Sequence, residues 1–225
     1  YDECRKLGIE VEGNIKLAGA TNPNIETIRR SIIPTQLCQV RNNTQYAPSF
    51  GIFEIGRVVE GLKENGLCNE KKKLAVTLFD KSGDTEELYR KLISMLTLIL
   101  GEVKHQKLRF EKVTADHAYI HPKNYNKVLC GEKELGVVGV VHPTVQKKID
   151  KRGTVVFAEL DMEVLSGLED KGIHYVRTSR YPSVEVDLSF VTDRFDPIAK
   201  AISEADSPLI KKVVLVDRYA DDQGH

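Results

Sequence analysis

Two pairs of apolar, strand-like segments occur in the chain, and a short polar turn joins each pair. FGIFEIGRVVEG (50–61) and LAVTLFD (74–80) flank a charged segment that contains an Asn-Gly pair. Asn-Gly is a residue pair that tight hairpin turns favour. Further along, VLC (128–130) and LGVVGVV (135–141) flank Gly-Glu-Lys-Glu. The two predicted hairpins restrict the fold to one built around an antiparallel sheet.

Two further segments, KLRFEKV (107–113) and TVVFAELD (154–161), also have the composition of strands. The run at 135–141 has no polar residue on either side of the strand, which predicts that other elements cover both of its faces. The middle of the chain is therefore expected to be rich in β-structure.

One helix is clearly indicated between the predicted strands. Asp84 can accept hydrogen bonds from the first turn, and Glu87 three residues later completes the pattern of a capping box. Gly101 is expected to end this helix. Its predicted buried stripe consists of Leu88, Leu92, Met95, Leu96 and Ile99. Together with the strands, this helix predicts an α+β fold in which helices flank an antiparallel sheet.

Two other segments are expected to be helical. NPNIETIRRSIIPTQLCQVRNN (22–43) is predicted to be a loop followed by a helix, with Pro34 marking a bend or a restart. VHPTVQKKI (141–149) is predicted to be a short helix that begins at its proline. The apolar residues of the first segment have roughly helical spacing; they are Ile28, Ile32, Leu37 and Val40.

The character of the sequence changes near RTSRYPS (177–183), which we interpret as a linker. Beyond it, 184–193 alternates like a half-exposed strand, 196–206 is predicted to be a helix, and 210–219 a second strand. This β–α–β order is typical of the first half of a ferredoxin-like sandwich. Two strands and one helix bury little surface, so we expect the rest of that domain to lie outside this chain.

Bulk composition excludes several classes of protein. The 225 residues include 33 basic and 33 acidic residues, so any binding of nucleic acid requires a local patch of positive charge. The four cysteines contain no C-x-x-C pair, which suggests reduced thiols and a cytoplasmic location. The most apolar stretch, LISMLTLIL, is far shorter than the roughly 20 residues that span a bilayer. The chain lacks an initiator Met and ends on DDQGH, so we expect a fragment of a longer protein.

Candidate metal and phosphate sites have simpler explanations. His117 and His121 are four apart, but on a strand this separation is roughly 13 Å, too far to share one ion. Glu159 and Asp161 share one face of a strand end, where capping of the next helix is the favoured explanation over a metal site. No P-loop or G-x-G-x-x-G pattern is present. The short lysine runs, such as Lys147–Lys148, are expected to be solvated surface.

Several segments, in order, resemble the β chain of bacterial phenylalanyl-tRNA synthetase. They are NP-(x)₄-IRRSIIPTQL, RNN, FEIGRVV, the helix after FDKSGDTEEL, HPKNYNKVLCGEKELGVVGVVHPTV, FAELDMEVL and RYPSVEVDLSFVTD…VVLVDRY. The resemblance covers the chain from about residue 20 to its end. It implies a class II synthetase-like module over 1–177, followed at 178–225 by a truncated, ferredoxin-like anticodon-binding domain.

The resemblance also implies a division of labour. In this family the α chain carries the class II active site that uses ATP, Mg²⁺ and phenylalanine, whereas the β chain assembles with it into a heterotetramer. This fragment is then expected to hold no catalytic residue, cofactor or metal, and to be a ligase component in the cytoplasm. Contact with tRNA(Phe) is expected from Arg194, Lys211, Lys212, Arg218 and Tyr219, and contact with the α chain from Ile28, Ile32, Leu37 and Val40.

The resemblance also predicts that this chain has lost catalysis. A working class II site has a phosphate-binding arginine where this chain has Glu60, and the negative charge of Glu60 would repel the phosphates of ATP. Arg57 precedes it but is expected to point to the opposite face of the strand. FAELDMEVL lacks the glycines and arginine of the third class II motif.

Two alternatives stay open. One is a free-standing, amino-acid-activating enzyme that would take its phosphate-binding group from Arg29, Arg30 or Arg41. The other is a scaffold module that makes no contact with tRNA.

Overall fold

The computed structural model describes residues 2–9, 15–18, 27–172, 181–191, 196–205, 209–210 and 212–217. The chain divides into two compact units, Tyr1–His174 and Tyr175–His225, and each is considered by itself. In the described part of the chain, no helix is both long and apolar enough to cross a membrane.

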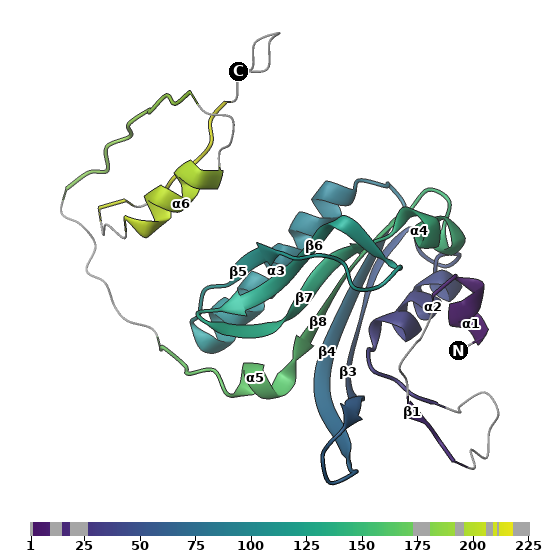
Figure 1. Ribbon diagram of the computed structural model, residues 1–225. Coiled ribbons are helices and arrows are strands. Elements are labelled where there is room, and N and C mark those ends of the chain that lie inside the picture. Colours follow the sequence, from purple (N-terminus) through teal and green to yellow (C-terminus); the bar gives the residue numbers. More distant parts are fainter. Residues whose placement is uncertain are drawn as a thin grey trace. The chain divides into compact units, whose positions relative to one another are not determined.

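The first unit is built on a six-stranded antiparallel sheet (Figure 1). Both predicted hairpins are confirmed, because the first two strands of the sheet pair with each other and so do the segments on either side of Gly-Glu-Lys-Glu. A separate ribbon pairs β1 (Ile15–Lys16) with β2 (Thr27–Ile28). In spatial order, the strands of the sheet are β3 (Ser49–Leu62), β4 (Cys68–Asp80), β8 (Thr154–Asp161), β7 (Lys133–Val141), β6 (Ile120–Cys130) and β5 (Arg109–Lys112).

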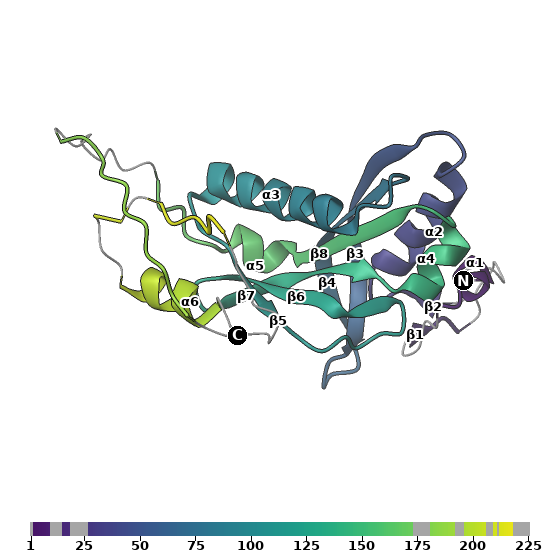
Figure 2. The ribbon, with the colours of Figure 1, turned by 90° about the horizontal axis from the view of Figure 1, so that it is seen from above.

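Helix α3 (Thr85–Lys104) runs along one face of the sheet (Figure 2). The predicted start is confirmed, because the Asp84 side chain accepts a hydrogen bond from the Glu87 backbone N–H at 2.9 Å. The predicted end at Gly101 is wrong: the helix continues to Lys104, and His105 adopts the left-handed conformation that ends it. A left-handed residue is a common helix terminator even when it is not glycine.

The buried row of α3 also differs from the prediction. Leu88, Leu92, Leu96 and Leu100 are at most 5% exposed, whereas Met95 and Ile99 are 37% and 42% exposed. The leucines recur at every fourth position and so lie along one side of the helix, which faces the sheet. Met95 and Ile99 lie toward the side of that row, where the sheet no longer covers them.

Three shorter helices pack on the opposite face: α2 (Ile33–Asn43), α4 (Pro143–Ile149) and α1 (Asp2–Lys6). Figures 1 and 2 show them gathered at one end of the sheet. The predicted helix at 141–149 is confirmed, with His142 as its N-cap. The predicted helix at 28–43 begins later, because Ile28 belongs to β2 and Pro34 lies in the first helical turn, where proline is tolerated.

Strands β7 and β8 approach each other closely at one glycine. Gly136 has φ of +150°, and a Cβ atom there would lie 2.0 Å from the backbone oxygen of Glu159. The apolar run of β7 is covered from both sides, as its sequence predicted: Val138 packs in the α3 core and Val141 in the α2 core. The short helix α5 (Met162–Ser166) follows β8 directly.

The second unit contains helix α6 (Asp196–Glu204), at the place where the sequence predicts one. The predicted strands at 184–193 and 210–219 are not formed over the described residues 181–191 and 212–217. Their apolar side chains are largely exposed, with Val186 at 71% and Leu215 at 53%. A strand needs a paired neighbour to satisfy its backbone groups, and neither segment has one among the described residues.

Candidate functional site

The arginine of the FEIGRVV segment points away from the protein interior. Along β3 the odd-numbered side chains from Ser49 to Arg57 are exposed, and the even-numbered ones are turned toward α2. The side chain of Arg57 is 78% exposed, and its Nη1 atom donates to Glu70 Oε2 at 3.0 Å. Arg57 therefore lies on the surface and cannot reach a ligand on the α2 face.

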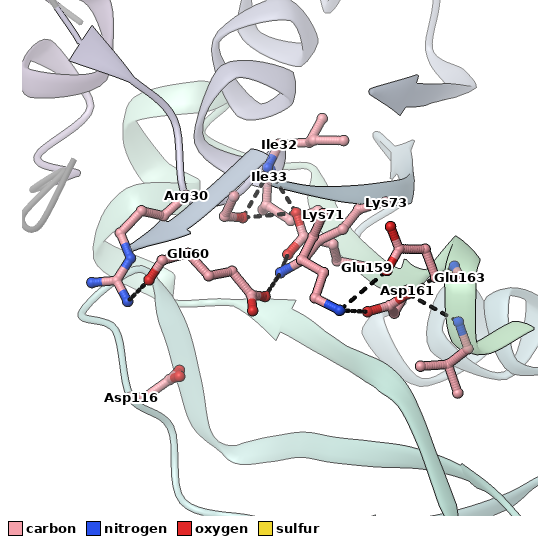
Figure 3. A network of polar contacts seen from close by, with 12 residues as sticks. Arg30, Ile32, Ile33, Glu60, Lys71, Lys73, Asp116, Glu159, Asp161 and Glu163 are labelled. Atoms are coloured by element: carbon pink, nitrogen blue, oxygen red, sulfur yellow. Dashed lines mark hydrogen bonds and ion pairs between the residues drawn. The ribbon is translucent and has the colours of Figure 1, made fainter. Parts of the chain in front are cut away.

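Glu60, three residues further along β3, is already paired. Its Oε1 atom lies 2.9 Å from Lys73 Nζ on β4, and its backbone oxygen accepts a hydrogen bond from Arg30 Nη2 at 3.1 Å (Figure 3). The strand pairing is irregular between Val59 and Leu62, next to this residue. The carboxylate of Glu60, which the sequence comparison placed where a working class II site has an arginine, is thus bound to a lysine of the same chain.

Lys73 joins the buried carboxylate of Glu159 to the more exposed carboxylate of Glu60. Its side chain is 16% exposed, and its Nζ atom lies 3.5 Å from Glu159 Oε2 as well as close to Glu60. Burial by itself favours the neutral amine, but the nearby charge of Glu159 and the hydrogen bond to Glu60 outweigh it and raise the pKa of Lys73. Lys73 is thus held as a cation, and both neighbouring anions are neutralised within the chain.

Glu159 caps a helix that begins far away in the sequence. Its Oε1 atom accepts from the Ile32 backbone N–H at 2.7 Å and from Ser31 Oγ at 3.0 Å. Ile32 is the N-cap residue of α2 and has no capping side chain of its own. A carboxylate at this position satisfies a free N–H and interacts favourably with the positive end of the helix dipole. Glu159 therefore fixes the start of α2 to strand β8.

The three arginines considered as alternative phosphate ligands do not converge. Arg29 pairs with Glu54 on β3 and also donates to Thr35 Oγ1 at 3.3 Å. Arg30 bonds to the Glu60 backbone, and Arg41 lies in the last turn of α2, at its other end. Arg29 and Arg30 are thus bound to β3 groups, while Arg41 lies at the far end of α2.

The two acidic side chains at the end of β8, Glu159 and Asp161, have different roles. Asp161 accepts hydrogen bonds from the backbone N–H groups of Glu163 at 2.8 Å and Val164 at 3.1 Å, so the predicted capping of the next helix is confirmed. Lys71 lies 3.2 Å from Glu163, and Glu163 with the nearby Asp161 raises the pKa of Lys71 (Figure 3). Glu159 takes no part in this cap.

The structure gives the histidines local roles. His121 Nδ1 accepts from the Lys123 backbone N–H at 3.1 Å, and His117 stacks on Tyr119 with ring centroids 5.2 Å apart. In the part of the chain that the structure describes, no group of three or more His, Cys, Asp or Glu side chains is arranged to hold a metal ion.

The side chains expected to contact another subunit lie mostly inside this chain. Ile32, Leu37 and Val40 are fully buried in the core beneath α2, and Ile28 in β2 is half-buried. Their apolar surface is thus already covered by this protein, and the three buried side chains leave no area for a partner.

Among the predicted tRNA-binding residues, Lys212 is exposed and lies in the described segment 212–217. The other four lie outside the described residues: Arg194, Lys211, Arg218 and Tyr219.

Sequence reasoning missed an exposed apolar strip on the α3 side of β3. Phe53 and Ile55 are 75% and 49% exposed, and β3 is an edge strand of the sheet. Their alternation with the half-buried residues of β3 was visible in the sequence, but the sequence does not say that the strand lies at an edge, beyond the cover of α3.

Comparison with known proteins identifies a consistent group of relatives. The family described as the phenylalanyl-tRNA synthetase β chain CLM domain matches residues 3–162. The phenylalanine–tRNA ligase β subunit of Geobacillus kaustophilus is 29% identical over 236 aligned positions, which cover 99% of this chain and 29% of that protein. The β subunit of Bacillus subtilis is also 29% identical, over an alignment that covers 95% of this chain and 28% of that protein. The chain spans less than a third of the length of these relatives.

Proposed function

This chain belongs to the phenylalanyl-tRNA synthetase β-chain family, and from that premise we propose that it is a non-catalytic part of a phenylalanine–tRNA ligase β subunit. In this proposal it assembles with a catalytic α chain, which supplies the sites for ATP and Mg²⁺, and it contributes to binding tRNA(Phe). Residues 1–177 are the assembly module, and 178–225 begin the anticodon-binding domain.

The observation that carries the proposal is the ion network of Glu60, Lys73 and Glu159. Binding of ATP phosphates needs cations whose charge is available to the ligand. Here the largely buried Lys73 is held between two carboxylates of the same chain, and Arg57 is turned to the surface. A phosphate brought to this place would meet Glu60 and would have to displace it from Lys73. The region supports helix anchoring rather than catalysis.

We assign the contact with the α chain to the exposed apolar strip rather than to the buried side of α2. Phe53 and Ile55 project from β3 on the same side of the sheet as α3. On α3, Met95, Leu98 and Ile99 are 37%, 63% and 42% exposed. Helix α3 packs on β8, β4 and β7, and β3 pairs with β4, so helix and strand both expose apolar side chains on this face of the sheet. Exposed apolar patches of this kind mark protein–protein contacts.

The tRNA contribution rests on the second unit and on the family premise. Of the residues predicted to contact tRNA, Lys212 is the one that the structure describes, and it is exposed; Arg194, Lys211, Arg218 and Tyr219 stay predictions. A cytoplasmic location is proposed as well, because all four cysteines are free thiols and translation takes place in a reducing compartment.

Co-expression with the catalytic chain from the same source tests the assembly. We expect the two chains to co-purify, and we expect the double variant Phe53→Ser/Ile55→Ser to lose the partner, since removal of central hydrophobic anchors costs about 2 kcal/mol or more each. Tyr46→Ser is the matched control, because Tyr46 is 78% exposed but lies outside the strip. Retention of the partner by the double variant contradicts the assigned surface.

Two further measurements separate the alternatives. Amino-acid-dependent ATP–pyrophosphate exchange by this chain alone would favour a free-standing enzyme. Deletion of the residues after 177 in the assembled ligase should weaken tRNA binding; unchanged binding would favour a scaffold without a tRNA contact from this unit.

A further inference from the structure

The ends of three helices surround a basic depression that the ion network does not involve. It has a volume of about 640 Å³ and lies between α1, the end of α2 and the end of α4. Figures 1 and 2 show these helices side by side. Its cationic lining residues are Lys6, Arg41, Lys147, Lys148 and Lys151. Three separate parts of the sequence thus bring positive charge to one place in a chain whose basic and acidic residues are equal in number.

The positive charge of the depression is not cancelled by its acidic lining. Among the described lining residues, Glu3 and Asp150 carry carboxylates. Asp150 is occupied elsewhere: it accepts from the backbone N–H groups of Arg152 at 2.8 Å and Gly153 at 2.9 Å, and its other oxygen lies 3.9 Å from Lys81. In the described ranges, none of the five cationic side chains forms an ion pair.

Helix dipoles explain only part of this arrangement. Basic residues are favoured in the last turn of a helix, where the dipole has about half an elementary negative charge. This accounts for the placement of Arg41, Lys147 and Lys148 in the last turns of their helices. It does not explain why the three helix ends meet, and half a charge at each end does not neutralise five cations.

We propose that this depression binds the backbone phosphates of double-helical RNA. The inference rests on the proposed function, which makes an RNA the expected nucleic acid, and adds a contact on the first unit. Lysine serves phosphates as a point charge, and four of the five cations are lysines. Among the described lining residues none is aromatic, so these residues offer nothing on which an unpaired base could stack. A duplex, which presents phosphates outward and keeps its bases stacked, fits this lining better than a single strand.

The polar residues of the lining suit the same ligand. Asn42, Thr44 and Gln45 follow Arg41 at the end of α2 and also line the depression. The Thr44 hydroxyl donates to the Arg41 backbone oxygen at 3.0 Å, and the Gln45 amide donates to the Asn42 backbone oxygen at 3.2 Å. The remaining amide N–H groups of Asn42 and Gln45 can supply hydrogen bonds to phosphate and ribose oxygens without reading the base sequence. The contact is therefore independent of sequence and depends on salt.

Fluorescence anisotropy with a labelled RNA hairpin, with a stem of about 16 base pairs, tests the site on the 225-residue chain. Each phosphate contact contributes about 0.9 to the slope of log K against log salt. Lys147→Gln/Lys151→Gln should lower that slope by about 2, and weaken binding by about tenfold per cation at 0.1 M salt. The charge-conserving Lys147→Arg/Lys151→Arg should bind like the wild type.

The matched control removes two exposed lysines outside the depression, Lys72→Gln/Lys112→Gln, and should leave affinity and slope unchanged. Equal losses in both double variants would overturn the site. Preferential binding of a polyglutamate peptide over RNA, with the same dependence on Lys147 and Lys151, would assign the depression to an acidic protein and overturn the RNA inference. The assay needs no α chain, so its failure is distinguishable from failure of the two chains to co-purify.

Discussion

Removing the charge of Glu159 should destabilise the first unit more than removing any other charge of the ion network. The carboxylate is 9% exposed as a side chain, bonds to the Ile32 N–H and to Ser31, and lies beside Lys73. Glu159→Gln keeps an oxygen for the start of α2 but places an amide N–H₂ group next to the buried ammonium. Hydrogen bonds to charged groups contribute about 1.5–3 kcal/mol. Since Lys73 retains Glu60, we expect a loss of about 2 kcal/mol, toward the lower end of that range.

Glu159→Ala should cost more, because it also leaves the Ile32 N–H without a partner. Removing one member of a buried ion pair costs about 3–5 kcal/mol, and the remaining contact with Glu60 places the expected value near 3 kcal/mol. Glu163→Gln is the control. Glu163 pairs with Lys71 at the surface, where its side chain is 59% exposed, so no measurable change is expected.

Urea denaturation of the whole chain, followed by circular dichroism because the sequence has no tryptophan, measures these differences. With a slope of about 2 kcal/mol per M, Glu159→Gln should lower the unfolding midpoint by about 1 M. Hydrogen exchange at the Ile32 amide should accelerate in Glu159→Ala. An identical midpoint for Glu159→Gln and Glu163→Gln would refute the reasoning, because it would mean that the anchoring of α2 to β8 contributes nothing to stability.

Three further perturbations test other features. Gly136→Ala should destabilise the protein by about 3 kcal/mol or more in the same urea assay, because its Cβ would meet the Glu159 backbone. Gly131→Ala has open space around it and should cost about 1 kcal/mol for its positive φ alone. Similar costs for the two variants would contradict the close approach of β7 and β8. Burial raises the pKa of Tyr119, so this phenol ionises first in the unfolded chain, and the free energy of unfolding falls as the pH rises above about 10. Tyr119→Phe should make this fall with pH shallower, and an unchanged slope of unfolding free energy against pH would contradict the prediction. The backbone N–H of Arg152 is the main group that lowers the pKa of Asp150. The ionised Asp150 therefore stabilises the folded chain above about pH 3.9, and this contribution is lost as the pH falls below that value. Asp150→Asn should flatten the acid limb of a plot of melting temperature against pH, and a limb as steep as the wild type's would exclude this role.

Much of the fold follows from local signals. Asn-Gly and Gly-Glu-Lys-Glu marked the two hairpins, Asp84 marked the start of α3, and Asp161 marked the start of α5. Each of these depends on residues within a few positions of one another, where turn and capping chemistry acts. The same rules misplaced the end of α3, because Gly101 is compatible with a helix end but does not require one.

The candidate site could be predicted only in part. The sequence correctly separated Arg57 from Glu60 by the alternation of a strand. It did not reveal that Glu159 caps α2, because 127 residues separate Glu159 from Ile32. It also assigned Ile32, Leu37 and Val40 to an interface, since an apolar helical stripe looks the same whether its own sheet or another chain covers it.

By itself, the sequence determined the family, the antiparallel hairpins, the helix caps and the absence of an arginine at the position of Glu60. These are properties of neighbouring residues or of their order along the chain. Only the tertiary structure decided which charges are neutralised and which are available, because that depends on distances between segments far apart in sequence. The charge of Lys73 is neutralised by Glu60 and Glu159, which come from two other strands. The cations around the end of α4 have no such partners among the described residues.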